Sequence, residues 1–284
     1  EEFIANLEHA PEPTLAESDL VEKGLVLAES GSWKMLPGSA MSHTRTYKKL
    51  EAGGEEIWGK ATCQLDVSAA KFFSLVWAIV SNRGVEVHIQ NDGYVPLFYL
   101  DVPNSHSGLL HAVKTLPSPV QNRVFHNWRV WDTVEIKGKP TFVIVAAPFD
   151  RYHENDHLKE QARFKGTSNL IEGRSFSVQV FTVVAPNVCN FTYINRVELG
   201  GKIPRKVIEW KVPQQLEWVR SRQEQLQRSD KEVDREVREA AVVRMRRPDS
   251  PHRSLNQDQR DLVERCKELK GISGGLSWTP MDLS

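Results

Sequence analysis

The chain has 284 residues, of which 40% are hydrophobic and 26% charged, and its 37 basic side chains balance 37 acidic ones. Zero net charge argues against a dedicated nucleic-acid-binding protein and against tight attachment to anionic membranes by electrostatics alone. No run of apolar residues approaches the ~20 needed to span a bilayer. We therefore expect a globular protein with one large domain and an extension, or with two small domains.

The cysteines and the start of the chain bear on its compartment. Cys63, Cys189 and Cys266 are far apart and odd in number, so they predict no disulfide framework. This favours a reducing compartment, and we expect a cytoplasmic protein. No signal peptide precedes the first residue, Glu1, so we expect a piece cut from a longer chain.

The first elements predicted are a helix and a hairpin. Thr14 can cap the helix, because Glu17 follows it at the spacing of a capping box. Two alternating segments, 42–51 and 56–67, are separated by a glycine pair and predict a β-hairpin.

Segment 68–84 predicts the clearest buried helix of the sequence. Ser68 can cap it, and apolar residues recur at helical spacing from Phe72 to Ile79. Gly84 is predicted to end this helix, because glycine commonly follows a helix C-terminus.

Strands are predicted from here to residue 199, about eight with those of the hairpin, and short turns favour antiparallel pairing. The segment 104–122 interrupts them, and we interpret it as a long and unusually apolar loop. The predicted strands after the second helix are 85–92, 94–102, 123–136, 141–149, 175–185 and 190–199.

A long helical segment is predicted from Pro204, and beyond about Leu226 it is almost wholly charged. Its apolar stripe consists of Val207, Trp210, Leu216 and Val219. The order of helix, strands, helix, strands and terminal helix predicts an α+β fold, with one curved antiparallel sheet gripping a C-terminal helix.

Segment 190–210 predicts a strand, a glycine turn and the start of a helix, in that order. It alternates as a strand, Gly200 and Gly201 then permit a sharp reversal, and Pro204 follows where the first turn of a helix accepts proline. This segment resembles the end of the steroidogenic-acute-regulatory-related lipid-transfer (START) domain, which has a similar T-Y-x-x-x-V-[DE]-x-x-G-x-[IL]-P pattern. The family often has tryptophan where this chain has Lys202.

The resemblance extends from about Leu15 to Arg228, because the order of elements matches as well. "NRVFHNWR" resembles the family's R-D-F-V-x-x-R strand, with Arg123 and Arg129 at its two arginines, although Val124 stands where the family commonly has aspartate. The resemblance implies a helix-grip fold, in which a curved antiparallel sheet wraps around a long C-terminal helix and encloses an apolar tunnel.

The resemblance also implies a lipid-binding domain over 14–228, followed by a charged tail over 229–284 that is helical or partly disordered. In this family the tunnel holds one lipid, such as a sterol or phospholipid, for non-vesicular transfer or lipid sensing. Burial of a lipid chain is worth ~0.8 kcal/mol per CH₂, so a closed tunnel can hold a molecule that water rejects. We expect transient membrane contact, no enzyme activity, and no cofactor, metal or nucleic acid.

Six polar residues are candidates for orienting the lipid. By resemblance to sterol-binding members, Arg129 matches a cavity arginine and Asp101 falls near its acidic partner. A buried pair of this kind is tolerated only when it is hydrogen-bonded, and it offers a site for a hydroxyl. The other candidates share the strand parity of this pair or lie on the last predicted strand: Tyr99, Asn127, Asn195 and Tyr193.

The apolar loop at 102–119 lies where the family has part of its lid. Its candidates for dipping into a bilayer are Leu109, Leu110, Val113 and Leu116. The alternative is that these side chains pack against the sheet.

Residues 153–157 spell HENDH, the H-E-x-x-H pattern in which two histidines on a helix bind zinc and the glutamate acts as base. Asn155 and Asp156 are poor helix formers, flanking charges leave almost no face to bury, and the next histidine is His252. We interpret the segment as a polar connection between two strands, and a zinc hydrolase is a remote alternative.

A regulatory or scaffold module within a larger multidomain protein is the second alternative. The domain would then sense a lipid while the tail at 229–284 binds a protein partner. Heptad spacing in the tail is weak, so a long coiled coil is not expected.

Overall fold

The structure is a computed structural model, and it describes most of the chain as far as residue 201. The described residues are 13–37, 44–50, 57–79, 97–104, 106–116, 120–149, 156, 159, 160, 169–201, 216, 219, 235, 238, 239 and 242. The predicted strand 85–92 lies outside these residues.

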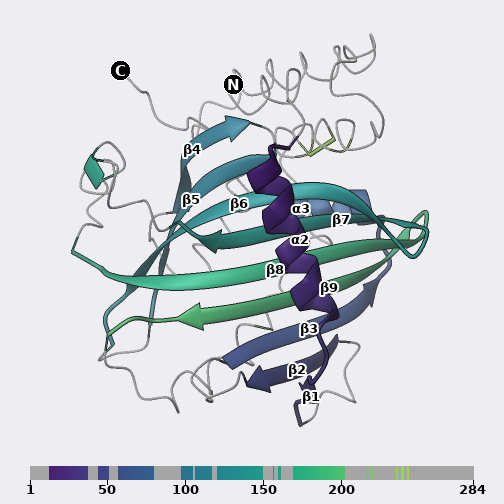
Figure 1. Ribbon diagram of the computed structural model, residues 1–284, viewed down its shortest axis with the longest axis horizontal. Helices are drawn as coiled ribbons and strands as arrows, with labels where there is room; N and C mark the ends of the chain where they lie inside the picture. Colours follow the sequence, from purple (N-terminus) through teal and green to yellow (C-terminus); the bar gives the residue numbers. More distant parts are fainter. Residues whose placement is uncertain are drawn as a thin grey trace.

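Nine strands form one sheet in the order β1-β2-β3-β9-β8-β7-β6-β5-β4, so the N-terminal hairpin pairs with the last strand (Figure 1). Every neighbouring pair is antiparallel, and a short parallel pairing also joins β6 to β8. The predicted antiparallel sheet is therefore confirmed. Its strands are β1 Lys34–Met35, β2 Thr44–Leu50, β3 Ile57–Leu65, β4 Leu97–Asn104, β5 Ser107–Lys114, β6 Arg123–Ile136, β7 Lys139–Pro148, β8 Ile171–Ala185 and β9 Val188–Glu198.

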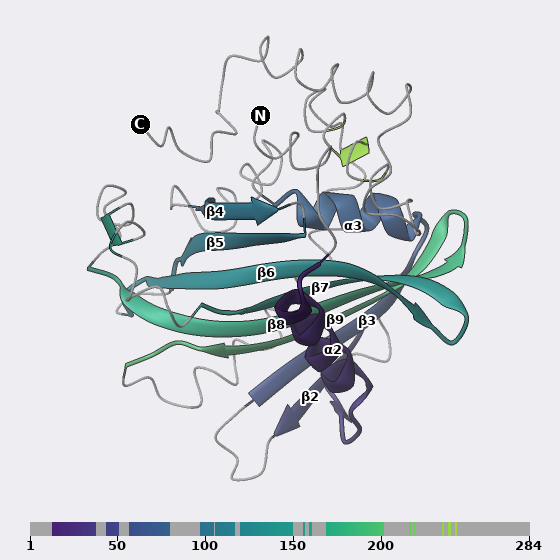
Figure 2. The same cartoon turned by 45° about the horizontal axis from the view of Figure 1, so that its top comes forward.

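Two helices cover opposite faces of this sheet, α2 (Leu15–Glu29) and α3 (Ala69–Trp77) (Figures 1 and 2). We call these faces the α2 face and the α3 face. No helix among the described residues is both long and apolar enough to cross a membrane.

Helix α2 begins with the predicted capping box. The Thr14 hydroxyl accepts from the Glu17 backbone N–H, and the Thr14 N–H donates to the Glu17 carboxylate at 2.7 Å. The helix buries Val21 on the strands, where it belongs to a cluster of valines that includes Val143 and Val178. A Cβ on Gly24 would lie 2.6 Å from a methyl of Val145, so this close approach of helix and sheet requires glycine.

Helix α3 begins as predicted but ends earlier. Ser68 caps it through the Lys71 N–H, and Phe72 and Phe73 are fully buried. Phe72 packs edge-on against Phe181 and Phe191, with ring centroids 5.5 and 4.9 Å away. The predicted end at Gly84 is wrong, because the helix stops at Trp77 with Ala78 as its C-cap.

The predicted apolar loop over 104–122 is also wrong. It contains the strand β5, which pairs with β4 on one side and β6 on the other. Three of the predicted lid residues are buried on this strand: Leu109, Leu110 and Val113 are 5%, 6% and 1% exposed. Leu116 follows the strand and is half-buried.

The turns that the sequence predicted after β6, β8 and β9 are confirmed. Lys137 and Gly138 both take positive φ between β6 and β7, and residues 186–187 separate β8 from β9. Gly200 and Gly201 have φ of +62° and +68°, values that glycine adopts without strain. Arg123 fixes this last turn, because its guanidinium donates to the carbonyls of Leu199 and Gly200.

Six residues beyond 201 are described, and all are helical. Leu216 and Val219 are each 1% exposed and belong to the same cluster as Phe72 on the α3 face. The remainder of the predicted C-terminal helix, including Val207 and Trp210, lies outside the described residues.

Candidate functional site

Arg129 lies on β6 and is 3% exposed, and its charged group is directed at the end of α3. One nitrogen donates to the Trp77 carbonyl at 3.2 Å, and the other donates to the Val76 carbonyl at 3.1 Å. The guanidinium also lies 4.9 Å from the centre of the Trp77 ring. The last carbonyls of a helix lack intrahelical donors and carry partial negative charge. The Arg129 guanidinium supplies both the hydrogen-bond donors and the positive charge.

Tyr99, on β4, completes this cluster. Its hydroxyl accepts from Arg129 at 2.6 Å and lies 3.4 Å from the Trp77 carbonyl, to which it can donate. Burial raises the pKa of Tyr99 more than the Arg129 charge lowers it, so the hydroxyl stays neutral. The Tyr99 ring crosses β5 at Gly108, where a Cβ would approach it to 2.9 Å. The contact between Arg129 and Tyr99 therefore depends on a glycine between them.

The strand register places Arg129 in a row of residues across the α3 face. Arg129 is opposite Ala146 on β7, Ala146 is opposite Ser177 on β8, and Ser177 is opposite Asn195 on β9. Gly59 on β3 follows Asn195. The row therefore combines small residues with polar ones.

The neighbouring rows differ in content. The next row lies two residues along each strand. It contains Gln179 and Tyr193, which are opposite each other on β8 and β9. Two residues further, Phe181 and Phe191 pack beneath α3. The aromatic part of this face is thus covered by α3, and the polar part lies beside it. We call this part the polar floor, defined as Asn127, Arg129, Ser175, Ser177, Gln179 and Asn195.

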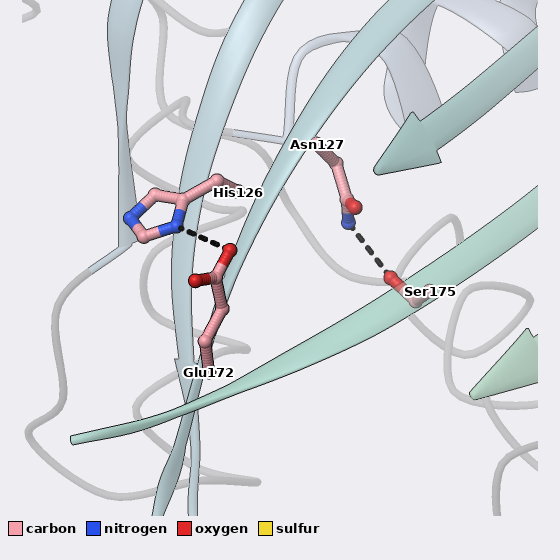
Figure 3. A network of polar contacts seen from close by, with 4 residues as sticks. All are labelled: His126, Asn127, Glu172 and Ser175. Atoms are coloured by element: carbon pink, nitrogen blue, oxygen red, sulfur yellow. Dashed lines mark hydrogen bonds and ion pairs between the residues drawn. The ribbon is translucent and has the colours of Figure 1, made fainter. Parts of the chain in front are cut away.

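Asn127 and Ser175 join β6 to β8 at one end of the polar floor (Figure 3). Their side chains are hydrogen-bonded at 2.8 Å. In the same part of the sheet, His126 and Glu172 point toward one another. The distance from His126 Nδ1 to Glu172 Oε1 is 3.6 Å. His126 in turn is opposite the fully buried His111 on β5, with ring centroids 4.9 Å apart.

Both histidines of this contact are buried. Burial, with the charge of His126 acting in the same direction, lowers the pKa of His111 to about 3. His111 is therefore neutral at physiological pH, and its protonation opposes folding.

Glu17 of α2 is a buried anion that holds the helix to the β4–β5 turn. Asn104 donates to its carboxylate at 3.2 Å, and the Ser107 hydroxyl also bonds to it. Asn104 closes the turn as well, because its oxygen accepts from the backbone N–H of His106 at 2.7 Å and of Ser107 at 2.9 Å. Burial raises the pKa of Glu17, but the bonds from Ser107, Thr14 and Asn104 together hold it below its ordinary value.

The structure brings some of the predicted site residues together. Arg129 and Tyr99 are in contact, and Asn127 lies two residues from Arg129 on the same face of β6. Asn195 lies in the same row as Arg129 but three strands away, and Tyr193 is its neighbour on β9. The side chain of Asp101 lies outside the described part, so its pairing with Arg129 stays a prediction.

Sequence reasoning missed Ser177 and Gln179 on β8. The signal was present, because Ser175, Ser177 and Gln179 alternate with apolar residues and share their parity with Phe181. This parity faces the interior, and polar residues at interior positions are informative.

Of the HENDH segment, only Asp156 is described. It is helical and exposed, and its carboxylate pairs with Lys159. Among the described residues, no group of histidine, cysteine and carboxylate side chains has the arrangement of a metal site. The histidines of the segment lie outside the described residues, and so does the predicted loop around them except for Asp156, Lys159 and Glu160.

The fold of this sheet and its two helices is shared with solved structures that include lipid-transfer domains. Human StAR-related lipid transfer protein 5 matches with a TM-score of 0.58 and 11% identity, over 75% of this chain and 95% of that chain. Human STARD10 matches with a TM-score of 0.56 and 13% identity, over 77% of this chain and 82% of that chain. The human StarD13 lipid transfer and protein localization domain matches with a TM-score of 0.50 and 14% identity, over 75% of this chain and 98% of that chain.

No protein-family model matches the sequence, and no curated protein matches it. The three structural matches show that the chain has an α+β fold of the StAR-related lipid-transfer type. The predicted resemblance to START domains is confirmed at the level of the fold.

Proposed function

We propose that the protein binds one lipid between the α3 face of its sheet and its C-terminal helix, for non-vesicular transfer or for lipid sensing. The observation that carries this proposal is the START-like fold over three-quarters of the chain, shared with two domains whose names include lipid transfer. In a helix-grip arrangement the C-terminal helix closes the α3 face. The burial of Leu216 and Val219 in the cluster of that face supports such a closure.

The α3 face suits this function because its two parts differ in chemistry. The aromatic part offers apolar contact, and the polar floor offers hydrogen bonds at one side of it. Ligand sites are typically apolar with a few polar groups that fix orientation. We expect this protein to act by binding rather than by catalysis, and to contact membranes only transiently.

The test is to purify the protein from a lipid-rich host and to analyse it by native mass spectrometry and lipid extraction. We expect one lipid per chain, retained after gel filtration. A chain truncated after Arg228 should keep this lipid and its transfer between vesicles if the protein is a carrier. Recovery of no lipid, together with no uptake of fluorescent sterol, phospholipid or fatty acid, would instead favour a scaffold module.

A further inference from the structure

One buried side-chain oxygen of the α3 face lacks a hydrogen-bond donor among the described residues. Gln179 is 8% exposed, and within the part of the chain that the structure describes nothing donates a hydrogen bond to its Oε1. A buried acceptor without a donor is costly, and such groups are rare in folded proteins. A side chain that is kept at this cost is a candidate for ligand contact.

The surroundings of Gln179 fit a ligand. On β8 it lies between Ser177 and Phe181, which puts it at the boundary between the polar floor and the aromatic part. Small residues surround the floor, because Ala146 lies opposite Ser177, and Gly59 lies opposite Asn195. Ser177 itself is only half-buried, so the floor keeps accessible surface next to Gln179.

The charges around the floor restrict which head group fits. Arg129 is the only described cation that the floor contains, and its two terminal nitrogens already donate to Val76, Trp77 and Tyr99. Three of its five N–H donors are therefore already used within the fold, which leaves few for a phosphate. Lys48 on β2 lies beyond Gly59 in the same row, but its side chain is exposed.

We propose that Gln179 Oε1 accepts a hydrogen bond from the polar end of the lipid, and that this lipid carries an uncharged donor, a hydroxyl or an amide N–H, rather than a phosphate. This inference rests on the proposed function and assigns its head-group chemistry. Arg129 is a positioning residue in this arrangement, because it fixes α3 and leaves recognition to a neutral acceptor.

The test compares lipids that differ in one group. Phosphatidylcholine vesicles are prepared with equal amounts of cholesterol, cholesteryl methyl ether, dioleoylglycerol and the methyl ether of dioleoylglycerol, and the lipids recovered with the protein are quantified. The two alcohol and ether pairs distinguish a sterol from an acylglycerol as the source of the hydroxyl. For at least one pair we expect the alcohol to exceed its ether about tenfold, the scale of one buried hydrogen bond.

Gln179→Leu should reduce this preference to less than about twofold while leaving the total lipid recovered similar. The ligand-free variant should be as stable as the native protein or more stable, because an unpartnered buried oxygen is gone. Gln179→Asn withdraws the acceptor by one methylene and serves as a second variant if the leucine variant does not fold. The matched control is Thr192→Val, which should keep the preference. Thr192 is next to Tyr193 in the chain, but its half-buried hydroxyl lies on the opposite face, the α2 face.

Equal recovery of alcohol and ether by the native protein would overturn the proposal, and so would a preference that survives both variants at Gln179. Preferential recovery of phosphatidylcholine, lost in Lys48→Gln, would overturn the head-group class while leaving the lipid-binding function intact. Recovery of no lipid at all would overturn the proposed function and this inference with it.

Discussion

At the scale of single residues, the described contacts of Arg129 differ from the contact that the family resemblance implied. The resemblance implied a cavity arginine paired with Asp101, whereas its described contacts are the end of α3 and Tyr99. The sequence could predict that Arg129 is buried, because it alternates with apolar residues on a central strand. It could not predict the partner, because α3 is far away along the chain.

Replacement of Arg129 tests this structural role. Arg129→Met should lower the free energy of unfolding by ~2–4 kcal/mol, because two helix carbonyls and the Tyr99 hydroxyl lose their donor in a buried site. Urea denaturation measures the change. Gly108→Ala should weaken the same cluster by displacing the Tyr99 ring, whereas Gly31→Ala, where a Cβ meets nothing within 4 Å, is the control.

If Arg129 contacted only the ligand, Arg129→Met would leave the urea midpoint within ~0.5 kcal/mol of the native protein and change lipid recovery alone.

At the scale of elements, β5 is the main correction. Its sequence contains Gly108 and is flanked by prolines, and both features favour a loop over a strand. The glycine is instead required by the Tyr99 ring, and the apolar residues on both faces are explained by cover from both sides. A strand buried on both faces loses the alternation by which strands are recognised, so its type could not be predicted from the pattern.

The burial of β5 reverses an expectation for Leu110. A lid residue could be replaced by aspartate without unfolding the protein, but Leu110 is 6% exposed and packs with Tyr99 and Val102. Leu110→Asp should therefore cost ~3 kcal/mol or more, or prevent folding, because it buries an unpaired carboxylate. Circular dichroism and urea denaturation give the measurement.

Thr115→Asp, at an exposed position just past β5, is the control and should fold normally. A stably folded Leu110→Asp variant that had lost only lipid transfer would restore the lid interpretation.

At the scale of the whole molecule, the two faces of the sheet carry different tasks. The α2 face contains valines, the Glu17 anchor and the His111–His126 pair, which serve stability. The α3 face contains the aromatic cluster and the polar floor. The fold was predictable because capping boxes, turn glycines and strand alternation are local signals. The site was predictable only in part, because Gln179 becomes unusual only once its oxygen is seen to lack a donor in the described part of the chain.

Buried His111 makes the stability of the molecule depend on pH. The pKa of His111 is lowered in the folded state to about 3, so between its ordinary value and that pH the unfolded chain binds more protons. Stability should therefore be highest above about pH 6.5 and fall as the pH drops below it, by about 2 kcal/mol at pH 5. Urea denaturation at pH 7, 6 and 5 measures this loss.

His111→Leu should flatten the dependence in this window. Glu17→Gln should leave it unchanged, because the lowered pKa of Glu17 places its loss of stability in more acidic solution. An equally steep loss in His111→Leu would show that other groups cause it.

The pairing of β3 with β9 determines the order in which the protein can be completed during synthesis. The hairpin β2–β3 emerges from the ribosome early, yet the strand that covers the edge of β3 is the last of the described strands to be made. Until then β3 presents an open edge with buried-type side chains, the kind of surface on which chains aggregate. The nascent chain should therefore need chaperone protection until residue 198 has left the exit tunnel, and the remaining strands can assemble around α3 before that time.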